Sequence, residues 1–139
     1  MNAPNRGWLI LYQYIAGLCD TATGLLLIVA PASTLRLVGL TIIPEPVVFV
    51  RYIGVFVLSV GLTYLWAVAR WPLTSHAHIG WSTQWKITAL VRTLVAVFVV
   101  WQIASSALEG RWISVALSDG AFATIQWIGL RKGWLERAG

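Results

Sequence analysis

The sequence predicts an all-α integral membrane protein: a four-helix bundle with short loops and a short interfacial helix after the first membrane helix. The 139-residue chain is 58% hydrophobic and only 11% charged, whereas about 25% of the residues in a soluble domain are charged. Its apolar residues gather in four runs, each long enough for a helix to cross roughly 30 Å of bilayer hydrocarbon. Because the runs lack the strict alternation of barrel strands, they predict helices, which satisfy their own backbone hydrogen bonds in lipid.

These runs define a single transmembrane domain over residues 1–139, with helices expected at about 8–30, 47–69, 84–108 and 112–130. Pro31 closes the first run, and Pro72 follows the second. The fourth run is interrupted by Asp119, and a central Asp costs about 2.5–3.5 kcal/mol on insertion scales. We expect this helix to insert because the other three offer its carboxylate a polar partner.

The segment between the first two runs, residues 31–44, predicts the short interfacial helix. Ser33 or Thr34 can cap its start, and Gly39 can end it. The apolar residues of the segment are typical of a helix that lies at the membrane surface. A polar, aromatic loop is expected over residues 71–83, and a tight turn around Gly110.

The basic residues predict the orientation of the helices. If successive helices cross in alternating directions, six basic residues lie on the side of the termini: Arg6, Arg70, Lys86, Arg131, Lys132 and Arg137. Three lie on the other side: Arg36, Arg51 and Arg111. Arg92 is not counted because it lies deep in its helix. The positive-inside rule then places both termini in the cytoplasm, and we expect a multi-pass protein of the bacterial inner membrane. The net charge of +5 is scattered at segment ends, which indicates contact with anionic membrane lipids and not with nucleic acid.

Ionisable residues inside the apolar runs are the strongest candidates for a site, because they are costly in a bilayer. Asp20 lies twelve residues from Trp8, and Asp119 lies twelve residues from Arg131 on the same side, so both carboxylates are expected about 18 Å deep. Arg92 is the nearest base. Arg51, near the opposite surface, can either reach toward the carboxylates or extend to the headgroups.

Two glutamines extend this pattern. Gln13 precedes Asp20 by seven residues, and Gln126 follows Asp119 by seven, so each shares a helix face with its aspartate about 10 Å nearer the cytoplasm. Small residues line the same stripe of the first helix, which permits close packing. We expect the first and fourth helices to face each other, or jointly to face Arg92. The resulting polar cluster either fixes helix packing as buried ion pairs or forms a path for protons or substrate.

The nine tryptophans gather mostly near one predicted boundary, more densely than anchoring requires. His76, His78, Trp81 and Trp85 are therefore candidates for contact with an interfacial ligand or a partner. The two histidines have no third ligand nearby, so no metal site is expected. The candidate cofactors are a quinone, a pigment or a lipid.

The segment from Pro31 to Gly39 after a glycine-rich first helix, followed by the stretch Val50–Gly61, resembles the DoxX-like group of small four-helix bacterial membrane proteins. The resemblance covers residues 8–130 as a pattern of helices. It implies the four-helix architecture and a group with varied roles, among them subunits of quinone-linked oxidoreductases. The chain shows no catalytic motif of such a group to carry over.

Three functions remain open from the sequence. The first is a non-catalytic accessory or structural subunit that packs against a larger respiratory or photosynthetic membrane complex, or against a second copy of itself. The second is a DoxX-like subunit of a quinone-linked oxidoreductase, with its quinone pocket near Asp20 and Arg92. The third is a carrier of protons or small solutes. The first is preferred because the chain has almost no extramembrane portion and shows no reactive constellation.

Overall fold

The computed structural model describes residues 6–70 and 77–138, with side chains for residues 6–70 and 80–137. This part of the chain is helical and contains no strand. Its long helices are α1 (Arg6–Val29), α3 (Val48–Arg70), α4 (Ala77–Ala104) and α5 (Ile113–Arg131). Its short helices are α2 (Pro31–Leu37), the 3₁₀ helix η2 (Gly110–Trp112) and α6 (Trp134–Ala138). The predicted all-α four-helix fold is confirmed, including the short helix after the first long one.

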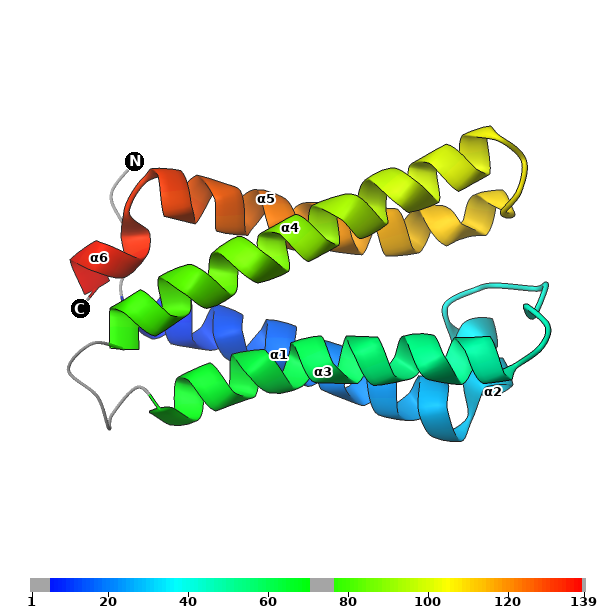
Figure 1. Cartoon of the computed structure of the whole chain (residues 1–139), viewed down its shortest axis with the longest axis horizontal. Helices are drawn as coiled ribbons and strands as arrows, with labels where there is room; N and C mark the ends of the chain where they lie inside the picture. Colours follow the sequence, from blue (N-terminus) through cyan, green and yellow to red (C-terminus); the bar gives the residue numbers. More distant parts are fainter. Residues whose placement is uncertain (1–5, 71–76, 139) are drawn as a thin grey trace.

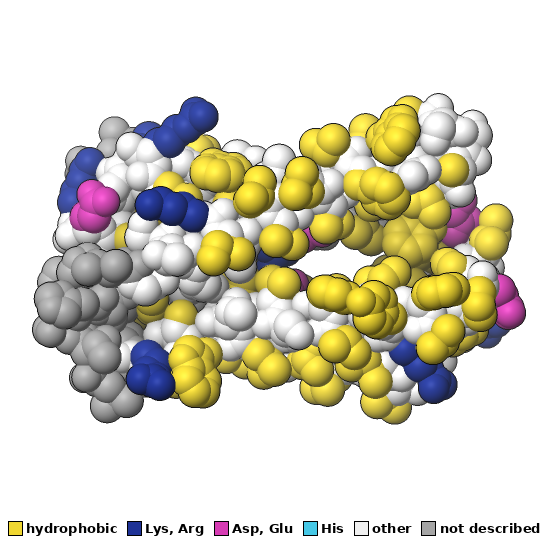
Figure 2. Space-filling model, in the orientation of Figure 1, with side chains coloured by type: hydrophobic (Ala, Val, Ile, Leu, Met, Phe, Trp, Pro, Cys, Tyr) yellow, Lys and Arg dark blue, Asp and Glu magenta, His cyan; other side chains and the backbone are white. Residues whose placement is uncertain are grey.

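Each long helix is apolar enough to cross a bilayer, with a mean hydropathy between 1.2 and 2.0 over its best window. Large apolar side chains such as Leu94, Val97 and Trp101 point outward and are more than half exposed. On the face drawn in Figure 2, apolar side chains cover much of the outer surface of the long helices. The chain is therefore a multi-pass membrane protein whose helices contact lipid.

The predicted bounds of the third membrane helix were wrong by several residues. Helix α4 begins at Ala77 and not at 84, because its first turns pack the rings of Trp81 and Trp85 into the core. It ends at Ala104 and not at 108. Ser106 has a φ of +60°, which ends the helix in the left-handed conformation.

Helix α2 begins differently from the prediction. Pro31 occupies its first turn, and no side-chain hydrogen bond caps its start. Proline has no backbone N–H, so its position in the first turn leaves one donor fewer to be capped. The hydroxyl of Thr34 donates instead to the carbonyl of Ala30 at 2.8 Å. Gly39, with a φ of +89°, follows the helix as predicted.

The four long helices form two hairpins, α1 with α3 and α4 with α5 (Figure 1). The first hairpin is held at close range by facing glycines. A Cβ added to Gly24 would lie 2.4 Å from the Leu58 nitrogen, and one added to Gly61 would lie 2.4 Å from the Thr21 nitrogen. The small-residue stripe of α1 thus packs on α3 and not on the fourth membrane helix. Of the two expected arrangements, direct contact between the first and fourth helices is therefore wrong, whereas their aspartates do both bind Arg92.

The hairpins meet near both ends of the bundle and part between them. One contact, at the end with the start of α1 and with α6 (Figure 1), is a mainly aromatic core. The other, at the α2 end, is a small apolar cluster of Leu27, Leu35, Leu40 and Val50, against which Trp112 packs. Between these contacts the space-filling view is hollowed, with acidic and basic atoms visible at the edge of the hollow (Figure 2). We call the first contact the aromatic core and the open region the central hollow.

Candidate functional site

Arg92 of α4 joins the two hairpins at mid-membrane. Its Nη1 donates to Oδ1 of Asp119 on α5 at 2.5 Å, and its Nη2 donates to Oδ2 of Asp20 on α1. Its Nε donates to the hydroxyl of Tyr64 on α3 at 3.4 Å. A single guanidinium therefore binds a group from each of the other three long helices, so the structure brings Asp20, Arg92 and Asp119 together as an ion triad.

Aromatic rings enclose the guanidinium. The Arg92 Cζ lies 4.6 Å from the centroid of the Phe122 ring and 5.7 Å from that of Tyr64. Such cation–π contacts partly offset the loss of hydration of a buried cation. Arg92 itself is only 4% exposed.

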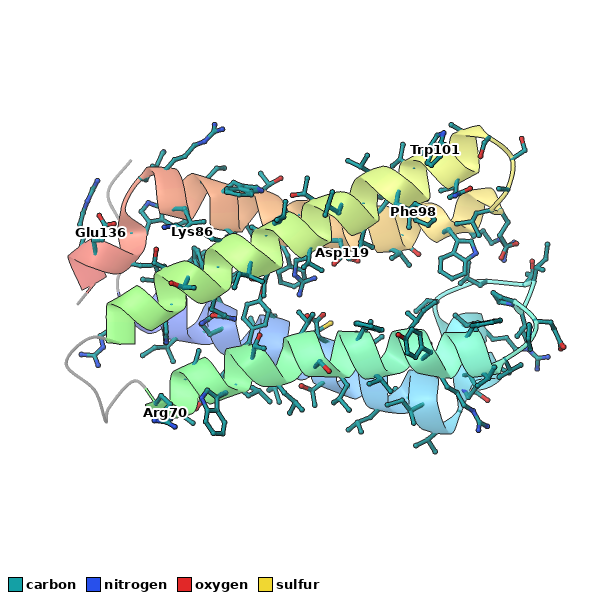
Figure 3. All side chains as sticks on the ribbon, viewed as in Figure 1. Arg70, Lys86, Phe98, Trp101, Asp119 and Glu136 are labelled. Atoms are coloured by element: carbon teal, nitrogen blue, oxygen red, sulfur yellow. The ribbon has the colours of Figure 1, made fainter. Side chains whose placement is uncertain are left out.

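The two carboxylates are less enclosed than the arginine. Their side chains are 13% exposed at Asp20 and 19% exposed at Asp119. Figure 3 shows Asp119 on the side of α5 that faces the other hairpin. The acidic side of the triad thus borders the central hollow, whereas its basic side is packed against rings.

A second layer of polar groups follows the triad toward the aromatic core. Gln126 is fully buried and donates from Nε2 to the Tyr64 hydroxyl at 2.8 Å and to Thr88 Oγ1 at 2.7 Å. Gln13, also fully buried, donates to Gln84 Oε1 at 2.8 Å. Both glutamines therefore lie on the aromatic side of their aspartates, as expected, but they hydrogen-bond to neutral groups that the sequence analysis did not name.

The spacing of polar residues along α4 could have identified Gln84 and Thr88 as the hydrogen-bond partners of the two glutamines. Gln84, Thr88 and Arg92 recur every four residues, which places them on one helix face. Thr88 Oγ1 donates to the Gln84 carbonyl at 2.9 Å and so continues the polar row along that face. Tyr64 has no such signal, because its hydroxyl role depends on which helix packs beside α3.

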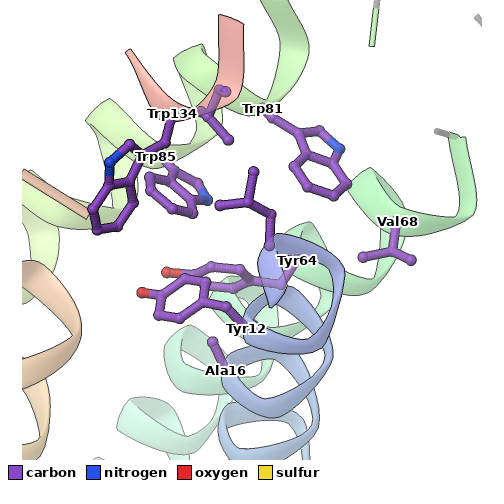
Figure 4. Packing of buried hydrophobic residues seen from close by; sticks show 9 residues of the cluster. Tyr12, Ala16, Tyr64, Val68, Trp81, Trp85 and Trp134 are labelled. Atoms are coloured by element: carbon purple, nitrogen blue, oxygen red, sulfur yellow. The ribbon is translucent and has the colours of Figure 1, made fainter. Parts of the chain in front are cut away.

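Trp81 and Trp85 lie in the aromatic core and not at a surface open to a partner (Figure 4). The Trp85 ring is fully buried and 5.1 Å from that of Tyr12. Gly129 of α5 makes room for it, since a Cβ there would lie 2.5 Å from Trp85 Cζ3. The Trp81 indole donates to the Ala67 carbonyl at 3.0 Å. The expectation that these two rings contact a partner is therefore corrected to internal packing between the hairpins, while Trp81 also lines a groove between α3 and α4.

The remaining candidate residues stand apart from the triad. Arg51 is exposed on the first turn of α3, at the α2 end, and is not one of the groups that bind the triad. This position agrees with extension toward the headgroups. His76 lies outside the described residues, and His78 lies in α4 with a side chain that is not described. Over residues 6–70 and 77–138, no group of three His, Cys, Asp or Glu side chains gathers as a metal site.

A lateral groove of about 950 Å³ runs between α3 and α4, on the other side of this polar row. Most of its wall is apolar, but the polar side chains of Ser59, Thr63, Thr83, Gln84 and Thr88 interrupt it. Arg70 and Trp66 stand at its end, with the guanidinium 5.0 Å from the ring centroid. The Nε2 of Gln84 has no acceptor among the described residues, but it is buried behind the wall and does not face the groove. The groove therefore offers a long, mostly apolar surface with a few polar side chains along it.

The chemistry available from these groups is binding, charge pairing and proton exchange. No protein-family model, curated protein or solved structure matches the chain.

Proposed function

We propose that this protein is a non-catalytic membrane subunit that binds a quinone-class amphiphile in the α3–α4 groove and holds it for a larger membrane complex. The observation that carries the proposal is the groove itself, whose mostly apolar wall is interrupted by Ser59, Thr63, Thr83, Gln84 and Thr88. An isoprenoid tail suits the apolar wall. A ring carbonyl accepts a hydrogen bond from one of the polar side chains.

The size and chemistry of the groove fit such a molecule. Ligand sites are usually mostly apolar, with a few placed polar groups and volumes of about 300–1,000 Å³. An alkyl chain makes no hydrogen bond with the polar side chains of the wall, whereas a carbonyl oxygen accepts from them. This difference favours a quinone over a lipid acyl chain.

The proposed pocket differs in place from the one expected from the sequence. The quinone was expected near Asp20 and Arg92, but those groups are occupied by each other. Thr88 connects the two regions, since it lines the groove and receives the hydrogen bond from Gln126. The DoxX-like group that the sequence resembles includes subunits of quinone-linked oxidoreductases among its varied roles.

The proposed location of this subunit is the bacterial inner membrane, within a larger complex. The basic asymmetry of the loops favours the bacterial inner membrane with both termini in the cytoplasm. In this proposal another subunit of the complex carries the redox centre that uses the quinone. Native mass spectrometry of the protein released in mild detergent should show that subunit and bound quinone together.

Binding is tested directly with a short-chain quinone added to the protein in lipid nanodiscs, read by quenching of tryptophan fluorescence. Thr63→Phe places a ring in the groove and should weaken binding at least tenfold. Thr124→Phe is the matched control, because both hydroxyls are exposed and donate to a carbonyl of their own helix at 2.7 Å. Equal quinone affinity for the two variants, or none for the wild type, would overturn the proposal.

A further inference from the structure

The ion triad is not electrically balanced. Two ionised carboxylates and one guanidinium leave it with a net charge of −1. Among the described side chains packed against it, Tyr12, Tyr64, Phe122 and Gln126 are neutral groups from α1, α3 and α5. Within its own helix, Thr88 is neutral and Lys86 is exposed. None of these groups supplies the missing positive charge.

An uncompensated charge at this depth is costly. Interactions between charges strengthen several-fold as the effective dielectric falls from that of water to that of a protein interior. Two carboxylates that share one site therefore do not both stay ionised without a second cation, and one of them takes up a proton. The aspartic-protease pair shows the same behaviour in a soluble protein.

The geometry leaves room for this proton. In the described structure, Asp20 and Asp119 each use one oxygen toward Arg92, and the other oxygen of each carboxylate has no partner. Both side chains keep some exposure, at 13% and 19%, and acidic atoms are visible at the edge of the central hollow (Figure 2). The hollow lies between the hairpins and away from the aromatic core, so it is the open side of the triad.

We propose that the Asp20–Arg92–Asp119 triad is an intramembrane proton-binding site, which holds one exchangeable proton reached through the central hollow. The proton moves between solvent water and a carboxylate oxygen, with no other bond made or broken. When it is on Asp20, the ion pair between the hairpins weakens; when it is on Asp119, the ion pair inside the second hairpin weakens. The position of the proton thus selects which helix Arg92 holds more firmly.

Infrared spectroscopy of the protein in lipid nanodiscs at neutral pH tests this site. The wild type should show the C=O stretch of a protonated carboxyl group, and the band should shift when the sample is moved into D₂O. Asp20→Asn and Asp119→Asn should each abolish the band entirely, because the remaining carboxylate is then balanced by Arg92. Glu109→Gln is the control and should leave it unchanged, since Glu109 lies outside the triad in the loop before η2.

Three results would overturn the proposal. The first is a wild-type spectrum without the band, as expected if a metal cation balances the charge or if water hydrates both ionised carboxylates. The second is a band that persists in either single Asn variant. The third is a band that D₂O does not shift, which would exclude exchange through the hollow. The wild-type measurement decides the main point even where a variant does not fold, and quinone binding to the α3–α4 groove is unaffected by any of these results.

Discussion

The indole nitrogen of Trp85 donates a 3.1 Å hydrogen bond to Oε1 of Gln13, and both side chains are fully buried. Because Trp85 belongs to α4 and Gln13 to α1, this bond joins the two hairpins inside the aromatic core. Gln13 also donates to Gln84. It therefore satisfies two groups of the opposite hairpin, where the surrounding rings exclude water.

Gln13→Leu should destabilise the protein by about 1–3 kcal/mol, because a buried donor that loses its partner keeps its desolvation cost. The change leaves the Trp85 indole without an acceptor. The measurement is the thermal unfolding midpoint in one detergent. Gln102→Leu is the control, since the Gln102 side chain makes no hydrogen bond among the described residues; an equal loss in both variants would contradict the role of Gln13.

Arg92→Leu should lower the yield of folded protein sharply. Breaking a buried ion pair costs about 3–5 kcal/mol in soluble proteins, and here two carboxylates lose their partner. Adding Asp20→Asn should recover part of the yield because the charge imbalance shrinks. Arg51→Leu should have little effect, since Arg51 is exposed. Wild-type stability of Arg92→Leu would mean that the triad contributes nothing to folding.

Gly61→Ala should separate α1 from α3, because the added methyl group meets the Thr21 nitrogen at 2.4 Å and backbone cannot yield as a side chain can. We expect a loss of at least about 1–3 kcal/mol, the usual range for overpacking. Gly120→Ala is the matched control, with open space around its Cβ. Alanine there should be neutral or stabilise α5 by up to about 1 kcal/mol. Thermal unfolding of the two variants side by side gives the comparison.

Stability should fall in acid through Glu109, in the loop at the α2 end. The hydrogen bond from the Thr41 hydroxyl, with backbone donors and Arg111 as smaller contributions, holds the pKa of Glu109 below its ordinary value of 4.5. Because the pKa of Glu109 is lower in the folded state, its ionised carboxylate contributes its full stabilising free energy at any pH above the unfolded-state pKa. This stabilisation is lost as the pH falls from the unfolded-state pKa through the folded-state pKa. Glu109→Gln should remove this part of the pH dependence, measured as the difference between the two unfolding curves.

Reporter fusions test the orientation. A fusion after Gly139 should be cytoplasmic and one at Gly110 should lie on the other side, given the basic asymmetry of the loops. Equal sidedness would mean that α5 does not cross. A reversed pair would mean that the asymmetry does not govern this chain.

The fold was predictable because it depends on the amount and length of apolar sequence, which four separate runs provide. The triad was predictable because helix rise converts residue number into depth: Asp20 and Asp119 share a depth, and Arg92 is the nearest base. Which helices pair was not predictable, because the glycines of α1 permit close packing against any helix and the sequence does not indicate which one. The burial of Trp81 and Trp85 was missed for the same reason: the space that receives Trp85 is set by Gly129, forty-four positions further along the chain. The groove depends on the angle between α3 and α4, which no single segment encodes.

The separation of Asp20 from Arg92 by 72 positions has a consequence for biosynthesis. A ribosome delivers α1 to the membrane before it has made the arginine that pairs with its carboxylate. The nascent first helix therefore partitions on the strength of its own leucines and aromatics, with Asp20 uncompensated or neutralised by a proton from water. The ion pair forms only after the second hairpin is synthesised, so it acts at assembly and takes no part in the entry of α1.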